Sequence, residues 1–306
     1  MNAEDSRLLE AAIGRRGARR ALELICGYFG CGETEPGAVV LLERGMSNRS
    51  FAFTLAGERY VCRCPGENLG NPMSRADEKR SLELAHRLGF ERSYLYADGT
   101  EGWLLSRWIA DFREPDYKSA ADTERVVEVL RRLHAVPQRP DYGLRPWEDA
   151  RALAMELRRT WPELLRPWEA LEARIGRLYE RTCGDGVEKC FCHGDVYQSN
   201  WMLLPDGGVN LIDWEYAGTA DPGVDLGYYI VDAGYGFDEA ERLIRAYLGE
   251  RFDETRRFHF MAYVAIVAWY WFLWALLRET RGIDSGGALE RWRDMARRYA
   301  DFQQTE

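Results

Sequence analysis

The side chains best suited to chemistry lie in residues 193–200, which read His-Gly-Asp-Val-Tyr-Gln-Ser-Asn. Asp195 and Asn200 are five residues apart on a predicted loop between two short apolar runs, and Asp213 ends the next apolar run. This spacing is typical of phosphoryl transfer, in which one carboxylate orients or deprotonates the attacking hydroxyl. An amide oxygen and a second carboxylate are suitable ligands for Mg²⁺ on nucleotide phosphates. A loop Asp or Asn can also simply cap a turn, but the combination with Asp213 favours catalysis.

The composition describes a folded, acidic protein. The chain has 306 residues, with 41 Lys and Arg against 50 Asp and Glu, a net charge of −9 and 46% hydrophobic residues. This excludes collagen-like, disordered and low-complexity classes. The acidic balance also predicts no nucleic-acid partner, because such binding depends on Lys and Arg at phosphates. The length favours two lobes over one core.

The seven cysteines and the charged N-terminus indicate a reducing, cytoplasmic location. Two pairs have the spacing Cys-x-Cys, Cys62 with Cys64 and Cys190 with Cys192. Each pair could ligate a metal ion, but it lies in a strand-like segment without further His or Cys at zinc-site spacing. Buried free thiols are therefore the favoured interpretation.

The predicted elements change in character near residue 111. A helical pattern at 5–30, interrupted by Gly14 and Gly17, precedes apolar runs typical of strands at 38–43, 49–55 and 58–64, a helix at 74–88, and strands at 93–97 and 102–109. Helices are predicted at 119–136 and 147–181, then three short apolar runs between 190 and 213, then helices to the end. We expect an α+β fold with a β-rich N-terminal lobe, residues 1–110, and a mainly helical C-terminal lobe, residues 111–306.

The segment Phe260–Leu277 contains eighteen residues without a charge. Its length would allow it to span a membrane. Its many Trp and Tyr residues, which prefer membrane interfaces, and the soluble character of the rest of the chain favour a helix buried inside the second lobe. We therefore predict no stable membrane insertion, with a membrane anchor as the alternative.

The motifs HGDVYQSN and LIDWEYAG resemble the choline kinase and aminoglycoside phosphotransferase superfamily, which shares the protein-kinase fold. Residues 45–48 (Gly-Met-Ser-Asn), 60–67, 75–78 and 213–218 are similar in particular to bacterial choline kinases, and the resemblance spans about residues 42–302. It implies a protein-kinase-like two-lobe fold and an enzyme that uses ATP and Mg²⁺.

The resemblance also implies roles for individual residues. Asp195 would be the base or hydroxyl-orienting residue, and Asn200 and Asp213 the magnesium ligands. Arg63 would grip the nucleotide phosphates, where protein kinases have lysine, and Glu78 would belong to the same nucleotide-binding site. The alternative is that Arg63 is a solvated strand residue with Glu78 as its surface partner.

Further nucleotide contacts follow from the same resemblance. Ser47 and Asn48 occupy the turn where protein kinases have a glycine-rich loop, although a plain hairpin turn explains these residues equally well. The segment Arg107-Trp108-Ile109 would be the hinge whose backbone pairs with adenine, with an ordinary edge strand as the alternative.

Two residues are expected to support the catalytic loop. His193 would brace it rather than act as a base. Asp225 would cap the helix that it opens or bond to the loop.

The acceptor implied by the resemblance is choline, whose quaternary ammonium requires aromatic faces and a carboxylate. Trp271 and Trp274 are three apart, on one helix face, and would line that pocket; core packing is the alternative. Asp232 would face the cation, Tyr235 would form an aromatic wall, and Glu215 would face magnesium or substrate.

Gly194 leaves the acceptor open, because choline kinases usually read His-Asn-Asp, whereas aminoglycoside, thiamine and homoserine-type relatives read His-Gly-Asp. We therefore expect a choline kinase, with ethanolamine, thiamine or an aminoglycoside as alternative acceptors. A non-catalytic nucleotide-binding pseudokinase is the alternative from a different functional class.

Overall fold

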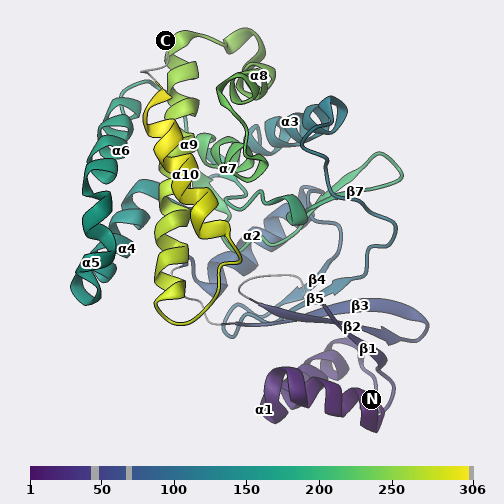
Figure 1. Ribbon diagram of the computed structural model, residues 1–306. Helices are drawn as coiled ribbons and strands as arrows, with labels where there is room; N and C mark the ends of the chain where they lie inside the picture. Colours follow the sequence, from purple (N-terminus) through teal and green to yellow (C-terminus); the bar gives the residue numbers. More distant parts are fainter. Residues whose placement is uncertain (43–47, 67–70, 303–306) are drawn as a thin grey trace. The chain divides into compact units, whose positions relative to one another are not determined.

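The computed structural model describes residues 1–42, 48–66 and 71–302 of the chain (Figure 1). The chain divides into two compact units, the first formed by residues 1–69 and 74–112 and the second by residues 70–73 and 113–306. Ser47, which we assigned to the nucleotide-binding turn, lies outside the described residues.

Among the residues that the structure describes, the first unit is a five-stranded antiparallel sheet with two helices. Its strands are β1 (Gly37–Leu42), β2 (Arg49–Leu55), β3 (Glu58–Cys64), β4 (Tyr94–Ala97) and β5 (Leu104–Arg107), in the order β1-β2-β3-β5-β4. The register places Arg63 of β3 between Ser50 of β2 and Leu104 of β5. The helix α2 (Arg75–Arg87) begins with a capping box between Ser74 and Asp77. These elements confirm the strands predicted between residues 38 and 109 and the helix predicted at 74–88.

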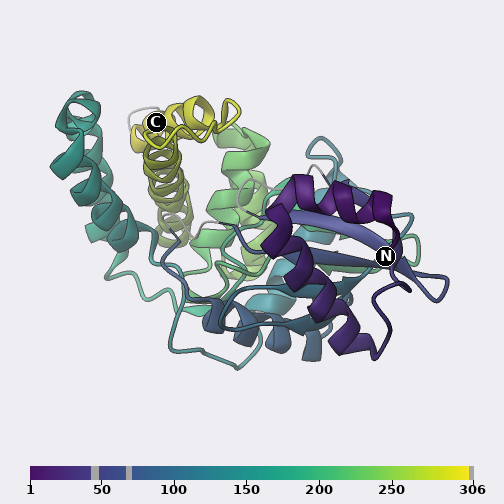
Figure 2. The ribbon, with the colours of Figure 1, turned by 90° about the horizontal axis from the view of Figure 1, so that it is seen from below.

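Helix α1 (Ala3–Phe29) covers one face of this sheet, as Figure 2 shows. The helix is broken at Gly14, which has φ 74° and ψ 160°, so the interruption predicted there is confirmed, whereas Gly17 is helical. Leu9 and Ile25 of α1 pack in one apolar cluster with Phe51 and Phe53 of β2. Burial of this face is what holds the leading helix on the sheet.

The second unit is mainly helical. Its helices are α3 (Ala120–His134), α4 (Pro146–Thr160), α5 (Pro162–Leu165), α6 (Glu169–Thr182), α7 (Gly223–Ala233), α8 (Phe237–Leu248), α9 (Glu254–Glu279) and α10 (Ala288–Ala300), with short 3-10 turns η1 (Arg166–Trp168), η2 (Gln198–Asn200) and η3 (Gly249–Arg251). The helical pattern predicted over 147–181 is confirmed but is divided among α4, α5, η1 and α6, because Pro162 cannot continue the α4 hydrogen-bond pattern and instead begins α5.

Two small antiparallel ribbons carry the loop that contains Asp195. Strand β6 (Cys190–Cys192) pairs with β9 (Gly218–Ala220), and β7 (Trp201–Leu203) pairs with β8 (Val209–Leu211). The predicted apolar runs are confirmed as β6, β7 and β8, whereas β9 was not predicted. With the first unit, these elements give the α+β, protein-kinase-like fold expected from the sequence.

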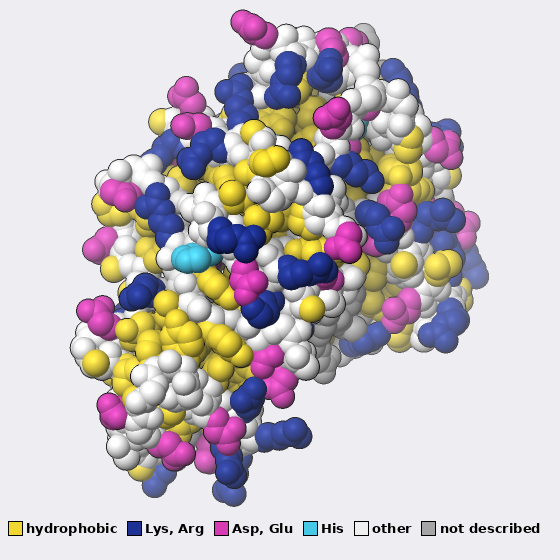
Figure 3. Space-filling model, turned by 180° about the vertical axis from the view of Figure 1, so that it is seen from behind, with side chains coloured by type: hydrophobic (Ala, Val, Ile, Leu, Met, Phe, Trp, Pro, Cys, Tyr) yellow, Lys and Arg dark blue, Asp and Glu magenta, His cyan; other side chains and the backbone are white. Residues whose placement is uncertain are grey.

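Helix α9 is the central helix of the second unit and packs against α7, α10, α4 and α6 (Figure 1). Its apolar segment is long enough to span a membrane, yet 94% of that segment is buried inside the structure, as predicted. Glycines allow the approach of α7, since a Cβ at Gly227 would lie 2.9 Å from the Tyr263 carbonyl oxygen. On the face shown in Figure 3, Lys and Arg side chains are interspersed with Asp and Glu.

Candidate active site

Asp225, in the first turn of α7, anchors the loop that follows β6. Its carboxylate accepts hydrogen bonds from the backbone N–H of His193 (2.9 Å) and of Gly194 (2.7 Å). His134 Nε2 lies 2.9 Å from the same carboxylate. Burial alone would raise the pKa of Asp225, but the hydrogen bond from His134 and the positive charge of that ring outweigh burial and lower it. Asp225 is therefore a buried anion that fixes the turn before Asp195.

His193 braces the same loop as a neutral ring. Its Nδ1 accepts a hydrogen bond from the Asp195 N–H (3.2 Å), so the proton lies on Nε2, which is 3.0 Å from the Ile212 carbonyl oxygen. The ring packs against Trp214, with centroids 4.5 Å apart. Burial lowers the pKa of His193 to about 4. Because both nitrogens are engaged and the ring is uncharged at neutral pH, the geometry disfavours a proton-accepting role.

Asn200 folds back onto Asp195 through the turn η2. Its Nδ2 donates hydrogen bonds to the Asp195 carbonyl oxygen (2.9 Å) and to Oδ2 (3.1 Å). Within the described part of the chain, the Asn200 side-chain oxygen accepts no hydrogen bond and is left for another partner.

Asp195 lies among other carboxylates. Burial raises the pKa of Asp195, and the charges of Asp213 and Glu215 raise it further, while hydrogen bonds from Tyr228 and Asn200 act in the opposite direction. By exposure the Asp195 residue is only half-buried, so the raising effect of burial is moderated by solvent. A bound cation would stabilise the ionised carboxylates of Asp195, Asp213 and Glu215.

Asp213 follows β8 in a left-handed backbone conformation, with φ 66°. Such a conformation is uncommon outside glycine and tends to mark a constrained site. The end of β8 is tied to the loop, because the Ile212 N–H donates to the Asn200 carbonyl oxygen (3.0 Å). Glu215, two residues on, is buried. Carboxylate and amide oxygens are the donor set that Mg²⁺ prefers, so the residues present fit that ion.

In the first unit, Arg63 and Glu78 form a buried ion pair between β3 and α2, and Arg75 Nη1 lies 2.9 Å from Glu78. Burial would raise the pKa of Glu78, but the two guanidinium groups outweigh it and lower the pKa. The alternative of a solvated Arg63 is therefore wrong. Asn48 lies near this network, where its Oδ1 accepts a hydrogen bond from the Gly66 N–H (3.1 Å).

The predicted hinge begins at the end of β5. Arg107 pairs with Tyr60 of β3, and the Trp108 N–H donates to the Arg59 carbonyl oxygen (3.0 Å). The Arg59 guanidinium lies over the Trp108 ring, 3.9 Å from its centroid. The Trp108 N–H is thus used within the sheet, and Ile109 is the first of the three residues beyond this bond.

Asp232, near the end of α7, already has several partners. It accepts hydrogen bonds from the Tyr117 hydroxyl and from the Gln198 N–H (2.9 Å), and Arg291 of α10 lies 3.4 Å from its other oxygen. The Tyr235 hydroxyl donates to the Tyr117 carbonyl oxygen. The Asp232 charge is therefore compensated by an arginine of the same unit.

Trp271 and Trp274 lie in a buried aromatic cluster, each only 2% exposed. Trp271 stacks on Tyr228, with centroids 4.9 Å apart, and both tryptophans contact Trp292 of α10. The indole N–H groups of all three tryptophans are buried without a hydrogen-bond partner among the described residues. The Arg278 guanidinium lies over the Trp274 ring, 4.4 Å from its centroid. One face of Trp274 thus already holds a cation.

The phosphotransferase enzyme family matches residues 38–260 of the chain, which is well over half of its length. The chain belongs to this family. Protein LicA of Haemophilus influenzae is 25% identical over 268 residues, 81% of this chain and 76% of that protein. A thiamine kinase of Escherichia coli is 26% identical over 267 residues, 83% of each chain.

Among solved structures, the choline kinase LicA from Streptococcus pneumoniae is similar to this phosphotransferase with a TM-score of 0.77 and 22% identity. The similarity covers 92% of this chain and 99% of that one. These findings confirm the resemblance on which the sequence analysis relied, and the protein-kinase-like fold that it implied.

Several residues near the candidate site of this phosphotransferase were missed by sequence reasoning. Tyr228 faces Asp195, Arg278 covers Trp274, Arg291 pairs with Asp232, and His134 bonds Asp225. Arg278 had a readable signal, since it follows Trp274 by one helical turn. The other three come from elements remote in sequence, and their pairing follows only from the fold.

Proposed function

We propose that this phosphotransferase transfers the γ-phosphoryl group of ATP to the hydroxyl of a small alcohol, in the cytoplasm and with Mg²⁺. The observation that carries the proposal is the convergence of Asp195, Asn200 and Asp213 from one loop and one strand end. The complete set disfavours a non-catalytic nucleotide-binding protein.

In this mechanism, Asp195 holds the acceptor hydroxyl and accepts its proton. The hydroxyl oxygen then forms a bond to the γ-phosphorus while the bond to the β-phosphate oxygen breaks, which releases ADP. The side-chain oxygen of Asn200 and the carboxylate of Asp213 would hold Mg²⁺, which neutralises charge on the phosphate oxygens. In the first unit, Arg63 held by Glu78 would bind phosphate, together with Ser47 and Asn48, and the backbone at residues 107–109 would pair with adenine.

For the acceptor, we propose choline first. The support is the aromatic cluster around Trp271 and Trp274, since aromatic faces suit a quaternary ammonium. Asp232, Tyr235 and Glu215 would complete the acceptor site in this proposal.

A second candidate is an alcohol that also carries several hydrogen-bond acceptors, such as thiamine with its pyrimidine nitrogens or an aminoglycoside with its sugar oxygens. Arg278 and Arg291 already occupy one face of Trp274 and one oxygen of Asp232, which weakens the case for a site that recognises its acceptor by a cation alone. The unpartnered indole N–H groups can also donate to an acceptor that carries oxygen or nitrogen lone pairs, which choline's ammonium does not offer.

The deciding experiment is ADP formation with Mg²⁺ and ATP in the presence of choline, ethanolamine, thiamine or kanamycin. The variant Asp195→Asn should lose about 10²–10⁴-fold in kcat. It should remain about as stable as wild type, because the amide has the same shape and its oxygen can still accept the hydrogen bond from Asn200 Nδ2. Asp206→Asn, in the β7–β8 turn, is the matched control and should retain wild-type turnover.

Stimulation by choline would support the first candidate, and stimulation by another panel member alone would support the second. Wild-type rates from Asp195→Asn would refute the mechanism for either acceptor. No acceptor-dependent ADP formation by the folded wild-type chain would favour the non-catalytic alternative.

A further inference from the structure

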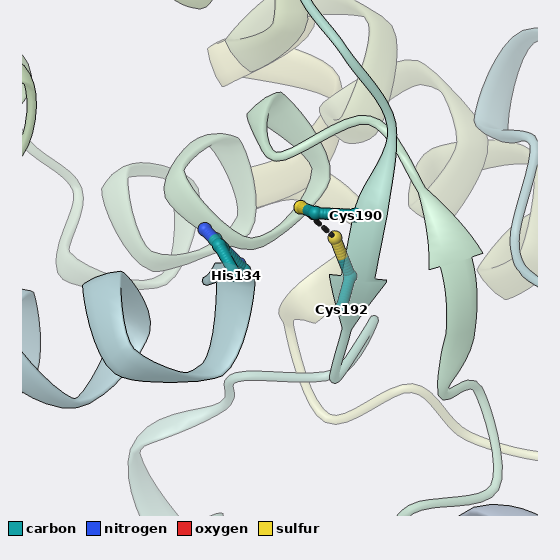
Figure 4. A group of neighbouring side chains, drawn as sticks. All are labelled: His134, Cys190 and Cys192. Atoms are coloured by element: carbon teal, nitrogen blue, oxygen red, sulfur yellow. Dashed lines mark hydrogen bonds between the residues drawn. The ribbon is translucent and has the colours of Figure 1, made fainter. Parts of the chain in front are cut away.

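Outside the candidate active site, two thiols and an imidazole meet in the interior of the second unit. Cys190 and Cys192 are two residues apart in β6, so both side chains lie on the same face of that strand. Their Sγ atoms are 3.5 Å apart. Both are free thiols and buried. Figure 4 shows His134, at the end of α3, together with this pair. One ligand atom of each residue lies within 4.8 Å of the other two.

The sequence offered no third ligand for this Cys-x-Cys pair, and the structure supplies one from more than fifty residues upstream. We propose that Cys190, Cys192 and His134 form a binding site for one thiophilic metal ion of the Zn²⁺ type. The proposal does not depend on the phosphotransfer function. It concerns a different set of ligands from the oxygen donors assigned to Mg²⁺.

The spacing of the two sulfurs suits such an ion. Two thiolates at about 2.3 Å from a tetrahedral Zn²⁺ are about 3.8 Å apart, so the observed pair needs to open by only about 0.3 Å. Binding forms two metal–sulfur bonds and one bond to Nδ1 of His134. It breaks two S–H bonds and the Nδ1–H bond of the protonated ring, and releases three protons to solvent.

His134 also has the outer contact that a metal-bound histidine usually has. Its Nε2 lies 2.9 Å from the buried carboxylate of Asp225, and ligating histidines commonly donate their second N–H to a carboxylate. Its Nδ1 lies 2.7 Å from the Tyr247 hydroxyl. Metal binding at Nδ1 would displace that hydroxyl or take its oxygen as the fourth ligand.

The chain contains a matched control for this proposal. Cys62 and Cys64 of β3 have the same spacing and are also buried. They belong to no group of three His, Cys, Asp or Glu ligands in the part of the chain that the structure describes. Burial also raises the pKa of Cys62. A pair of thiols alone is therefore expected to bind much more weakly than the Cys190, Cys192 and His134 group.

The test is a titration of the reduced, chelator-treated full chain with Cd²⁺ in excess Mg²⁺, followed by thiolate-to-metal charge-transfer absorption. The magnesium occupies carboxylate sites, and only sulfur ligands give this band. We expect one equivalent to bind to wild type, at least tenfold weaker binding for Cys190→Ala and for Cys192→Ala, and unchanged binding for Cys62→Ala. Bound Cd²⁺ should also raise Tm for wild type and not for Cys190→Ala, because the ion stabilises only the folded chain.

A second measurement detects a metal ion that enters the buried site too slowly to be seen in the titration. Wild type and Cys190→Ala are expressed with added Zn²⁺, purified without chelator and analysed for metal content. Bound zinc in wild type that is lost in the variant supports the proposal. The proposal is overturned if the folded wild type neither gives the charge-transfer band with Cd²⁺ nor carries zinc. It is also overturned if metal binding survives in Cys190→Ala and disappears in Cys62→Ala.

Discussion

Gly194 gives the sharpest structural prediction, because its substitution adds a clash to a backbone penalty. The residue has φ +82°, and a Cβ there would lie 2.5 Å from the Tyr216 carbonyl oxygen and 2.9 Å from the Tyr216 Cβ. Gly207, in the β7–β8 turn, has nearly the same φ, +83°, but a Cβ there would meet nothing within 4 Å. Gly207→Ala therefore isolates the backbone penalty, whereas Gly194→Ala adds the collision.

The expected magnitudes follow from these two differences. A left-handed residue with a side chain costs about 1–2 kcal/mol at either position. Overpacking a rigid neighbour adds about 1–3 kcal/mol at Gly194. In a unit of this size, each kcal/mol shifts Tm by roughly 2–4 °C. Gly194→Ala should therefore melt clearly below Gly207→Ala, and Gly194→Ala alone should lose turnover because it displaces Asp195.

The assay is thermal and urea unfolding of both variants beside wild type, with ADP formation measured on the folded protein. Equal Tm values for the two variants would refute the steric reasoning. Gly194→Asn extends the test, because Asn tolerates left-handed backbone better than Ala but carries the same Cβ. If Gly194→Asn is as stable as wild type, Tyr216 can move aside, and the His-Gly-Asp motif does not reflect a steric requirement.

Three further outcomes are expected. Arg63→Gln should lower Tm and raise KM for ATP more than Arg63→Lys does. The glutamine leaves Glu78 buried with Arg75 as its remaining cation, and breaking a buried ion pair costs about 3–5 kcal/mol. Equal effects of the two variants would contradict a requirement for positive charge at this position. If Asp232 faces the acceptor, Arg291→Gln should lower KM for choline about 2–5-fold, because it removes a half-exposed cation that competes for the Asp232 carboxylate. An unchanged KM would show that Asp232 does not bind the cation of the acceptor. Burial would lower the pKa of His259, but the carboxylates of Asp221 and Asp185 outweigh it and raise the pKa. The stability that protonated His259 contributes is therefore complete below about pH 6.5 and is lost as pH rises through its folded pKa. The Tm difference between wild type and His259→Gln should shrink across that pH range. A Tm difference that does not change with pH would contradict this role of protonated His259.

Local patterns in the sequence were sufficient for most elements and insufficient for those defined by a partner. The runs 49–55 and 58–64 coincide with β2 and β3, because alternating apolar residues mark a strand wherever it pairs. Strand β9, Gly218–Ala220, has no such pattern and is a strand only because it pairs with β6. The break at Pro162 was readable, since proline cannot continue a helix, but the helical pattern on either side concealed it.

The candidate active site divides in the same way. The spacing of Asp195 and Asn200 is local, and the turn η2 brings the two side chains together as their spacing suggests. The support of the loop is not local, because Asp225 lies about thirty residues after the backbone groups that it holds, and His134 lies much earlier in the chain. Such contacts depend on how α3 and α7 pack, which no window of sequence contains.

The proposed acceptor site shows why residue types alone do not decide specificity. Aromatic side chains and an acidic residue predict a cation pocket, but a cation supplied by the protein satisfies the same features. Arg278 covers a face of Trp274 from one turn along α9, which the sequence could have indicated. Arg291 reaches Asp232 from α10, a contact that the sequence could not have indicated. Because a substrate cation must displace or share these contacts, it gains less than an empty cage would give it. The proposed recognition of choline therefore depends on what Arg278 and Arg291 do when the acceptor binds. Comparing KM for choline in wild type and in Arg291→Gln measures the contribution of Arg291 directly.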